Sequence, residues 1–184
     1  MHDVLIGLAK AAILVALNQP ENFDLEGALK QYPQLKENGA VFVTINKRAN
    51  DQLRGCIGSL QAYRPLYKDV IANAQSAALH DPRFPPLTPE ELKNIKIEVS
   101  VLSEPKVLHY SDIDDLKKKI VPMKDGIVLR HDGYQATYLP QVWEQLPDFD
   151  AFFSSLCMKA GLPGNCLDLH PEIQVYHVTK YEEE

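Results

Sequence analysis

The sequence predicts an α+β fold in which two β-β-α units share one antiparallel sheet. The main observation is a repeated order of elements, because a hairpin followed by a helix that opens with proline occurs over residues 40–79 and again over residues 126–160. The strand segments also alternate apolar and polar residues, which is typical of half-buried strands. We expect residues 1–184 to form a single domain, or two fused sub-domains that meet at a cleft.

The first half is expected to begin with an amphipathic helix over residues 3–17, where apolar residues recur at helical spacing. Residues 41–45 and 53–58 are interpreted as the two strands of the first hairpin. Pro65 lies at a favourable first position of the next helix, which carries a stripe of small residues and reaches residue 79. We expect this helix to pack closely against the sheet.

The middle of the chain is expected to hold two short helices and one strand. Residues 88–91 combine a capping box with a proline just inside the helix start. Residues 95–101 alternate apolar and polar side chains, which predicts a strand whose polar face meets solvent or a cleft. Residues 111–114 carry the signal for a second short, charged helix.

The second half is expected to carry the other hairpin, because Asp132 and Gly133 form the strongest short turn signal in the chain. The two strands of this hairpin are residues 126–131 and 134–139. Two helices follow, and Gly161 is well placed to end the second of them. The helices are expected at residues 142–146 and 150–160, and a last strand at residues 173–179.

Charge and composition argue against several classes of protein. The net charge of −6 and the isoelectric point near 5.5 disfavour a wide nucleic-acid surface, which needs clustered Lys and Arg. The apolar start of the chain lacks the pattern of a signal peptide and is too short to cross a bilayer comfortably. The three cysteines have no paired spacing and are interpreted as free thiols in a reducing compartment. We therefore expect a cytoplasmic protein without a membrane partner.

The stretch LRGCIG at residues 53–58 is the first candidate for a functional site. It places Arg54 and Cys56 beside two glycines, where the backbone can approach another group closely. In one reading, Arg54 and the backbone amides lower the pKa of an exposed Cys56 thiol and make it reactive. In the other, Cys56 is a buried residue in a strand with a glycine bulge, and free cysteine is buried often enough to favour this reading from the residues alone.

A rigid loop over residues 80–87 is the second candidate. Its three prolines restrict the backbone, so that in one reading Arg83 is held out for a carboxylate or phosphate ligand. In the other reading, Asp81 pairs with Arg83 and stabilises the turn. The residues leave both readings of Arg83 open. His80 is interpreted as a helix C-terminal residue that interacts with the helix dipole.

Other side chains give weaker signals. Glu98 lies on the polar face of its strand, and Lys159 is interpreted as a surface lysine near a helix end. Cys157 is expected in the core, and Cys166 is expected to be a loop thiol. The histidines show no metal-ligand spacing, and there is no nucleotide-binding or serine-hydrolase motif, so we expect neither a metal nor a cofactor.

Several of these segments resemble the AMMECR family, whose bacterial members are called AmmeMemoRadiSam system protein A. The resemblance is carried first by LRGCIG at residues 53–58 and DPRFPPL at residues 81–87, and it covers nearly the whole chain. A tryptophan that relatives often carry near Cys166 is absent here. The other matching segments are EVSVL at residues 98–102, GIVLR at 126–130, ATYLPQVWEQLP at 136–147 and KAGL at 159–162.

The resemblance implies two β-rich repeats joined in one barrel-like antiparallel sheet, in agreement with the repeated order of elements. It also favours Cys56 as a cleft residue, because the matching motif is polar and rich in glycine. The residues that match polar cleft positions of the family are Arg54, Cys56, Asp81, Arg83, Glu98 and Thr137.

The leading hypothesis is an enzyme, or a component of one, in which Cys56 acts as nucleophile or reducible thiol while Arg54 and Arg83 hold a small anionic substrate. The family name implies Memo-like and radical S-adenosylmethionine proteins as partners. The alternative is a non-catalytic adaptor that presents the cleft to a partner protein, and a buried Cys56 beside an apolar patch favours it. An RNA-associated regulator is the weakest hypothesis, because the chain is acidic.

Overall fold

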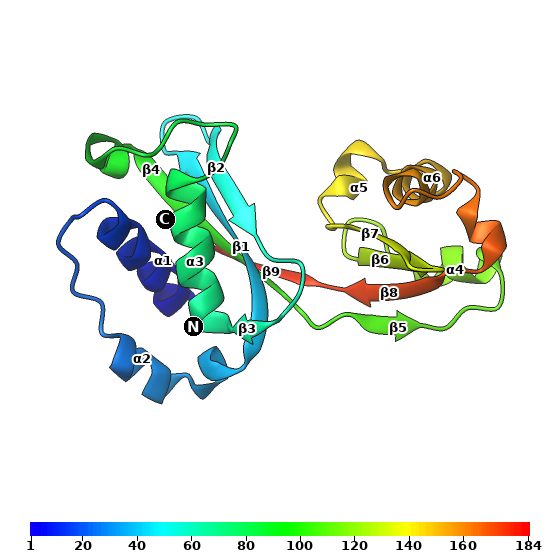
Figure 1. The fold of residues 1–184 in the computed structure, drawn as a ribbon, viewed down its shortest axis with the longest axis horizontal. Helices are drawn as coiled ribbons and strands as arrows, with labels where there is room; N and C mark the ends of the chain where they lie inside the picture. The colour runs from blue at the N-terminus through cyan, green and yellow to red at the C-terminus, as the bar shows by residue number, and fades with distance from the viewer. The chain divides into compact units, whose positions relative to one another are not determined.

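The computed structural model describes residues 1–184 and divides them into two compact units (Figure 1). The first unit contains residues 1–102 and 179–184, and the second contains residues 103–178. Both units combine helices with antiparallel strands, which confirms the α+β class. The expectation that both hairpins share one barrel-like sheet is wrong, because a five-stranded and a four-stranded sheet are separate and open. No helix has the length and apolar content that a membrane crossing needs.

The first unit has a sheet of strand order β2-β1-β4-β9, and the short β3 pairs with the start of β1. Its strands are β1 (Asn38–Lys47), β2 (Leu53–Gly58), β3 (Arg64–Pro65), β4 (Ile95–Leu102) and β9 (Val178–Glu182). Its helices are α1 (His2–Ala16), α2 (Leu25–Gln31), α3 (Leu66–Leu79) and the 3-10 helices η1 (Pro33–Lys36) and η2 (Pro89–Asn94). The predicted hairpin, helices and β4 are present, whereas α2, η1 and β3 are too short for a periodic signal.

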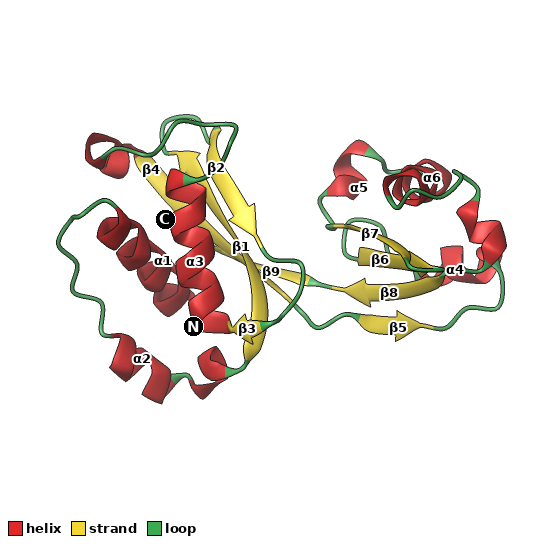
Figure 2. Ribbon diagram, viewed as in Figure 1, coloured by secondary structure: helices red, strands yellow, loops and turns green.

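The two faces of this sheet differ in character. Helices α1 and α3 cover one face, as Figure 2 shows, and Val41, Val43 and Ile45 of β1 are fully buried in the core on that side. Between them, Phe42 and Thr44 are only half-buried. Because successive side chains of a strand point to opposite faces, Thr44 and its partners on neighbouring strands lie on the face away from the helices. That face carries the polar side chains.

Gly55 of β2 allows α3 to approach the sheet without an intervening side chain. A Cβ atom built on Gly55 lies 2.2 Å from the carbonyl oxygen of Ala77, a distance that no real Cβ contact tolerates. On the helix, Ala74, Ala77 and Ala78 are buried, as the stripe of small residues predicts. The contact is therefore between the backbone of β2 and the backbone of α3, and a larger residue at position 55 has no room.

A buried carboxylate joins the elements around this contact. Asp69 of α3 has no exposed surface, and its oxygens accept hydrogen bonds from the amide of Val41, the hydroxyl of Ser59, Nε of Arg64 and Nδ2 of Asn73. These donors come from β1, from the residue after β2, from β3 and from α3 itself. Because every donor is directed at one carboxylate, the network fixes how α3 crosses the sheet.

The second unit has strand order β5-β8-β6-β7 and an aromatic core. Trp143 stacks on Phe152 with ring centroids 3.6 Å apart, and its indole nitrogen donates to the carbonyl of Asp125 at 2.8 Å. Asp132 and Gly133 have φ values of 48° and 82°, which confirms the predicted tight hairpin turn. The elements are β5 (Lys106–Leu108), α4 (Ile113–Lys119), β6 (Gly126–His131), β7 (Tyr134–Tyr138), α5 (Val142–Gln145), α6 (Phe149–Lys159), η3 (Cys166–Leu169) and β8 (Glu172–Tyr176).

The expected last strand over residues 173–179 is divided between the two sheets. β8 ends at Tyr176 and pairs with β5 and β6, whereas β9 begins at Val178 and lies beside β4. Between them, the amide of His177 donates to the hydroxyl of Ser103 at 2.8 Å. Apolar residues continue on both sides of this break, so the sequence pattern carries no sign that the strand changes sheets.

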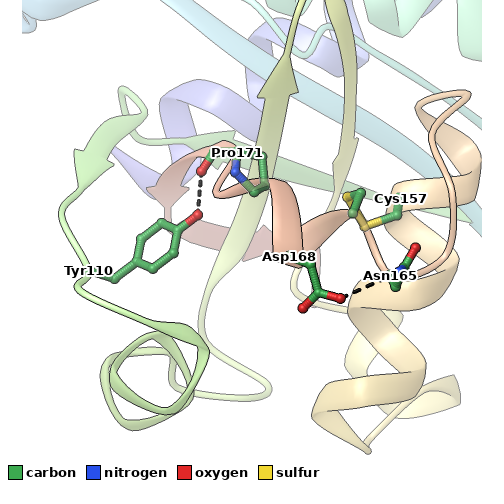
Figure 3. Close-up of a disulfide and its surroundings, with 6 residues drawn as sticks. Tyr110, Cys157, Asn165, Asp168 and Pro171 are labelled. Atoms are coloured by element: carbon green, nitrogen blue, oxygen red, sulfur yellow. Dashed lines mark hydrogen bonds between the residues drawn. A yellow bond between two sulfur atoms is a disulfide. The ribbon is translucent and has the colours of Figure 1, made fainter.

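The expectation of three free cysteines is also wrong. Figure 3 shows a disulfide between Cys157 in the last turn of α6 and Cys166 at the start of η3, and Cys56 is the free cysteine. Both bridged residues are buried. Their nine-residue separation matches no standard motif, so only the return of the chain after α6 reveals the pair.

We expect Gly55→Ala to destabilise the first unit, because the added methyl group meets the backbone of α3 and cannot be relieved by a rotamer change. Overpacking typically costs about 1–3 kcal/mol, and a backbone obstacle places this variant at the upper end. The loss of stability is the difference between the free energies of unfolding of the wild type and the variant, measured in urea. Gly133→Asn is the matched control, since nothing lies within 4 Å of a Cβ there and Asn tolerates positive φ. Equal stability of both variants contradicts the proposed contact.

We expect the purified, denatured protein to react with a thiol reagent at one cysteine before reduction and at three cysteines after reduction. Mass spectrometry gives the number of labelled cysteines. A loop of this length predicts that Cys166→Ala lowers the free energy of unfolding by roughly 2–3 kcal/mol. Three reactive thiols before reduction, in protein kept free of reductant, will disprove the bridge.

Candidate functional site

Three side chains form a row across the polar face of the first sheet. Thr44 of β1 lies directly opposite Cys56 of β2 and directly opposite Glu98 of β4. The hydroxyl of Thr44 donates to Sγ of Cys56 at 3.3 Å. On the other side, Glu98 accepts a hydrogen bond from Ser100 at 3.1 Å and lies 3.8 Å from Nζ of Lys180 on β9. The sheet thus brings a thiol, a hydroxyl and a carboxylate together on one surface.

Asp81 joins the two motifs that the sequence singles out. Its Oδ2 accepts from the amide of Cys56 at 2.9 Å and from Nη2 of Arg83 at 2.8 Å. Its Oδ1 accepts from the amide and from Nε of Arg83, both at 3.0 Å. The guanidinium of Arg83, with the amides of Cys56 and Arg83, holds the pKa of this buried carboxyl well below its usual range.

Arg83 remains accessible although it is paired. Its side chain is 56% exposed, and Nη2 also donates to the carbonyl of Cys56 at 3.3 Å. Both readings of this arginine are therefore compatible with the structure, because the pair with Asp81 stabilises the loop and leaves part of the guanidinium facing solvent. The planar group presents its remaining N–H donors beside the thiol.

Arg54 has a structural partner. Its Nε and Nη2 donate to the two carboxylate oxygens of Glu91 in η2, at 2.9 and 3.1 Å, and its side chain is almost completely buried. Arg54 is the extra residue of a β-bulge, since Gly55 pairs with Ile45 while Leu53 pairs with the next residue of β1. The expected ligand contact of Arg54 stays a prediction, but its charge is already balanced inside the unit.

The Cys56 thiol is half-buried and protonated near neutral pH. Burial is the main cause that raises its pKa, and the negative charges of Glu98 and Asp81 act in the same direction. The hydrogen bond from Thr44 and the charge of Arg83 lower the pKa but do not reverse the shift. Of the two readings of Cys56, the raised pKa agrees with the buried one, because burial and the two carboxylates outweigh the effects of Thr44 and Arg83.

Phe42 forms an apolar wall beside the row. Its ring lies over Gly58, where a Cβ atom built on the glycine would be 2.2 Å from the ring carbon Cγ. Gly58 is the position directly opposite Phe42 in the pairing of β1 with β2. The second glycine of LRGCIG is thus required by a packed aromatic ring next to the thiol, which the residue pattern alone does not reveal.

Thr137, the remaining predicted site residue, belongs to the second unit. Its hydroxyl shares a hydrogen bond with Oη of Tyr176 at 3.0 Å, and its carbonyl accepts from Nζ of Lys159 at 2.9 Å. Burial raises the pKa of Tyr176 to about 12. Lys159 also lies over the ring of Tyr138, 4.8 Å from the centroid. Lys159 is therefore bound to an edge strand rather than being a freely solvated lysine.

The fold and these residues define an α+β protein with a cysteine on an open sheet face and an arginine beside it at the sheet edge. The AMMECR1 family matches residues 6–181, so the chain belongs to this family. Over 189 aligned residues it is 36% identical to Protein MK0488 of Methanopyrus kandleri, with 99% of this chain and 88% of that protein covered.

Two further comparisons also cover almost the whole chain. Protein PF1979 of Pyrococcus furiosus is 36% identical, again with 99% of this chain and 88% of the relative covered. The crystal structure of uncharacterized protein PH0010 from Pyrococcus horikoshii superposes with a TM-score of 0.78 at 34% identity, over 100% of this chain and 91% of that chain. The resemblance carried by LRGCIG and DPRFPPL is thereby confirmed.

We expect Asp81→Asn to lower the free energy of unfolding at neutral pH by about 2–3 kcal/mol, because a buried charge pair loses its anion. The folded-state pKa of Asp81 is depressed, so its contribution is present above the unfolded value near 4 and is lost as the pH falls through the lower folded value. Urea titrations at neutral and strongly acidic pH will show the difference between wild type and variant shrinking in acid. Asp132→Asn, at an exposed turn, serves as control. A pH-independent difference contradicts the assignment.

Proposed function

We propose that the polar face of the first sheet binds a small anionic ligand through Arg83, next to the Cys56 thiol, and that the protein acts as an enzyme or as a component of one. The observation that carries this proposal is the position of Arg83. Asp81 fixes its guanidinium against the backbone of Cys56, and more than half of the side chain is nevertheless exposed.

The fixed guanidinium is suited to a carboxylate or a phosphate. An arginine has five N–H donors, and those of Arg83 that Asp81 and Cys56 do not use remain in a fixed direction. Holding the side chain in place before the ligand arrives reduces the entropy lost on binding. Phe42 supplies an apolar wall on the same face, in keeping with a small-molecule site that combines apolar surface with few polar groups.

The Cys56 thiol lies beside the proposed anion site, although a site that only binds an anion does not need a thiol. In its protonated form, Cys56 donates a hydrogen bond or a proton to a bound ligand; as a nucleophile it first has to lose that proton. The raised pKa of Cys56 is the specific observation that favours the second candidate, a non-catalytic adaptor in which the thiol only packs. A reactivity measurement in the presence of ligand separates these two functions.

The name of the AMMECR family members that the chain resembles is the ground for two proposed partners, a Memo-like protein and a radical S-adenosylmethionine protein. We also propose a cytoplasmic location for the protein. Size-exclusion chromatography of the chain mixed with these two proteins from its own organism is expected to give a common peak. Separate elution of all three would remove the partners from the proposal and leave the ligand site standing.

The ligand site is tested by protection of Cys56 from iodoacetamide at alkaline pH, where a larger fraction of this thiol is ionised than at neutral pH. Hexanoate and inorganic phosphate, each at about 10 mM, are the probes, since isolated anion contacts bind in the millimolar range. We expect at least one probe to slow alkylation roughly threefold in the wild type and not in Arg83→Gln. Arg130→Gln, which removes an exposed arginine of the second unit, should behave as the wild type.

Either of two results would contradict the proposal that the protein is an enzyme with an anion site at Arg83. If neither probe protects Cys56, or if Arg83→Gln is protected as well as the wild type, Arg83 holds no anion beside the thiol. The adaptor then becomes the preferred function. Circular dichroism of Arg83→Gln has to match the wild type, so that lost protection reflects the missing guanidinium rather than a disordered loop.

A further inference from the structure

The ring of Phe42 lies over β2, next to the proposed anion site. Its carbons Cγ, Cδ1 and Cδ2 are 2.2, 2.4 and 2.5 Å from the position that a Cβ atom of Gly58 would take, so the ring leans over β2. Gly58 follows Cys56 by two residues on this strand, so both positions face the same side of the sheet. The ring and the thiol are therefore neighbours, about 7 Å or one strand repeat apart.

Phe42 is an apolar side chain in polar surroundings. It is only half-buried, although its ring is large. The next side chain of β1 on this face is Thr44, and the residue directly opposite Phe42 on β4 is Ser100. A half-exposed ring beside a few fixed polar groups is typical of a small-molecule site.

Arg83 has few donors left for a ligand. Nε donates to Oδ1 of Asp81, and Nη2 donates both to Oδ2 of Asp81 and to the carbonyl of Cys56. Asp81 therefore occupies one paired edge of the guanidinium, and Nη1 carries the two N–H groups that Asp81 and Cys56 leave. The guanidinium also lies over the ring of Phe84, 5.5 Å from the centroid. An anion thus meets one nitrogen instead of a two-pronged fork, which is the weaker arrangement.

We propose that the ligand of Arg83 is an amphipathic organic anion, whose carboxylate or phosphate binds Nη1 and whose apolar group lies against Phe42. This inference rests on the proposed function and names the substrate class of that site. Because one nitrogen holds an anion weakly, most of the affinity has to come from the rest of the ligand. Phe42 then decides which anions bind, and inorganic phosphate or a short carboxylate is a poor ligand.

Three probes test this inference. Butanoate carries the anion alone, 4-phenylbutanoate adds an apolar ring to the same chain, and 4-phenylbutanamide keeps the ring without the charge. The readout is the concentration of probe that halves the rate of Cys56 alkylation by iodoacetamide, in which the thiolate sulfur forms a bond to carbon and iodide leaves. In the wild type, we expect 4-phenylbutanoate to act at a roughly tenfold lower concentration than butanoate, because its ring leaves water against Phe42. The amide is expected to act no better than butanoate.

Variants of Phe42 identify the contact. In Phe42→Ala, we expect 4-phenylbutanoate to act within roughly twofold of butanoate, because the apolar surface is lost. The value for butanoate itself should not change, which distinguishes a lost apolar contact from a disturbed loop. Phe42→Leu keeps a smaller apolar side chain and should retain a roughly threefold advantage, and it replaces the alanine variant if that variant does not fold. Tyr134→Ala, which removes an exposed ring of the second unit, is the control.

The outcomes separate this inference from the proposed function. If butanoate and 4-phenylbutanoate protect the wild type equally, and Arg83→Gln abolishes both effects, the anion site stands and the assigned substrate class is wrong. A tenfold advantage that persists in Phe42→Ala also overturns the inference, because the ring of the probe then binds elsewhere. If 4-phenylbutanamide protects as well as 4-phenylbutanoate, and Arg83→Gln changes neither, the apolar contact stands and the proposed anion site fails.

Discussion

The first unit depends on the direct contact between the backbone of β2 at Gly55 and the backbone of α3 at Ala77. Because no side chain separates the two elements, the C-terminal end of α3 lies close to the edge of β2. The loop that follows the helix starts from this position, and Asp81 reaches the amide of Cys56 as a consequence. The cysteine, the carboxylate and the arginine meet because one glycine has no Cβ atom.

The same arrangement explains how a sheet edge is kept from pairing with other strands. β2 is one of the two edge strands of its sheet, and an unpaired edge can pair with a further strand. At Cys56 the amide donates to Asp81 and the carbonyl accepts from Arg83, so both outward groups are already used. The residues proposed to hold a ligand thus also protect the edge. A substitution of Asp81 is expected to affect both properties.

Short sequence motifs predicted turns and helix starts well, but they did not predict contacts between residues far apart in the sequence. The turn at Asp132 and Gly133 and the capping box before η2 depend on residues within a few positions of each other, and both are present. The bulge directs Arg54 to Glu91, which is distant in sequence, and no local signal predicted this pair. The division of the strands between two sheets and the Cys157–Cys166 bridge likewise depend on where the chain returns, which composition and periodicity do not encode.

The position of β9 bears on how the chain folds during its synthesis. β9 completes the first sheet beside β4, yet the ribosome makes it only after the whole second unit has been made. During that interval β4 has an unpaired side, and the nascent first unit is an incomplete sheet exposed to wrong pairings. The second unit has no such delay, since all of its strands lie within one continuous segment. The half that carries Cys56 is therefore the half whose sheet is completed last, after residues 103–178 have been made.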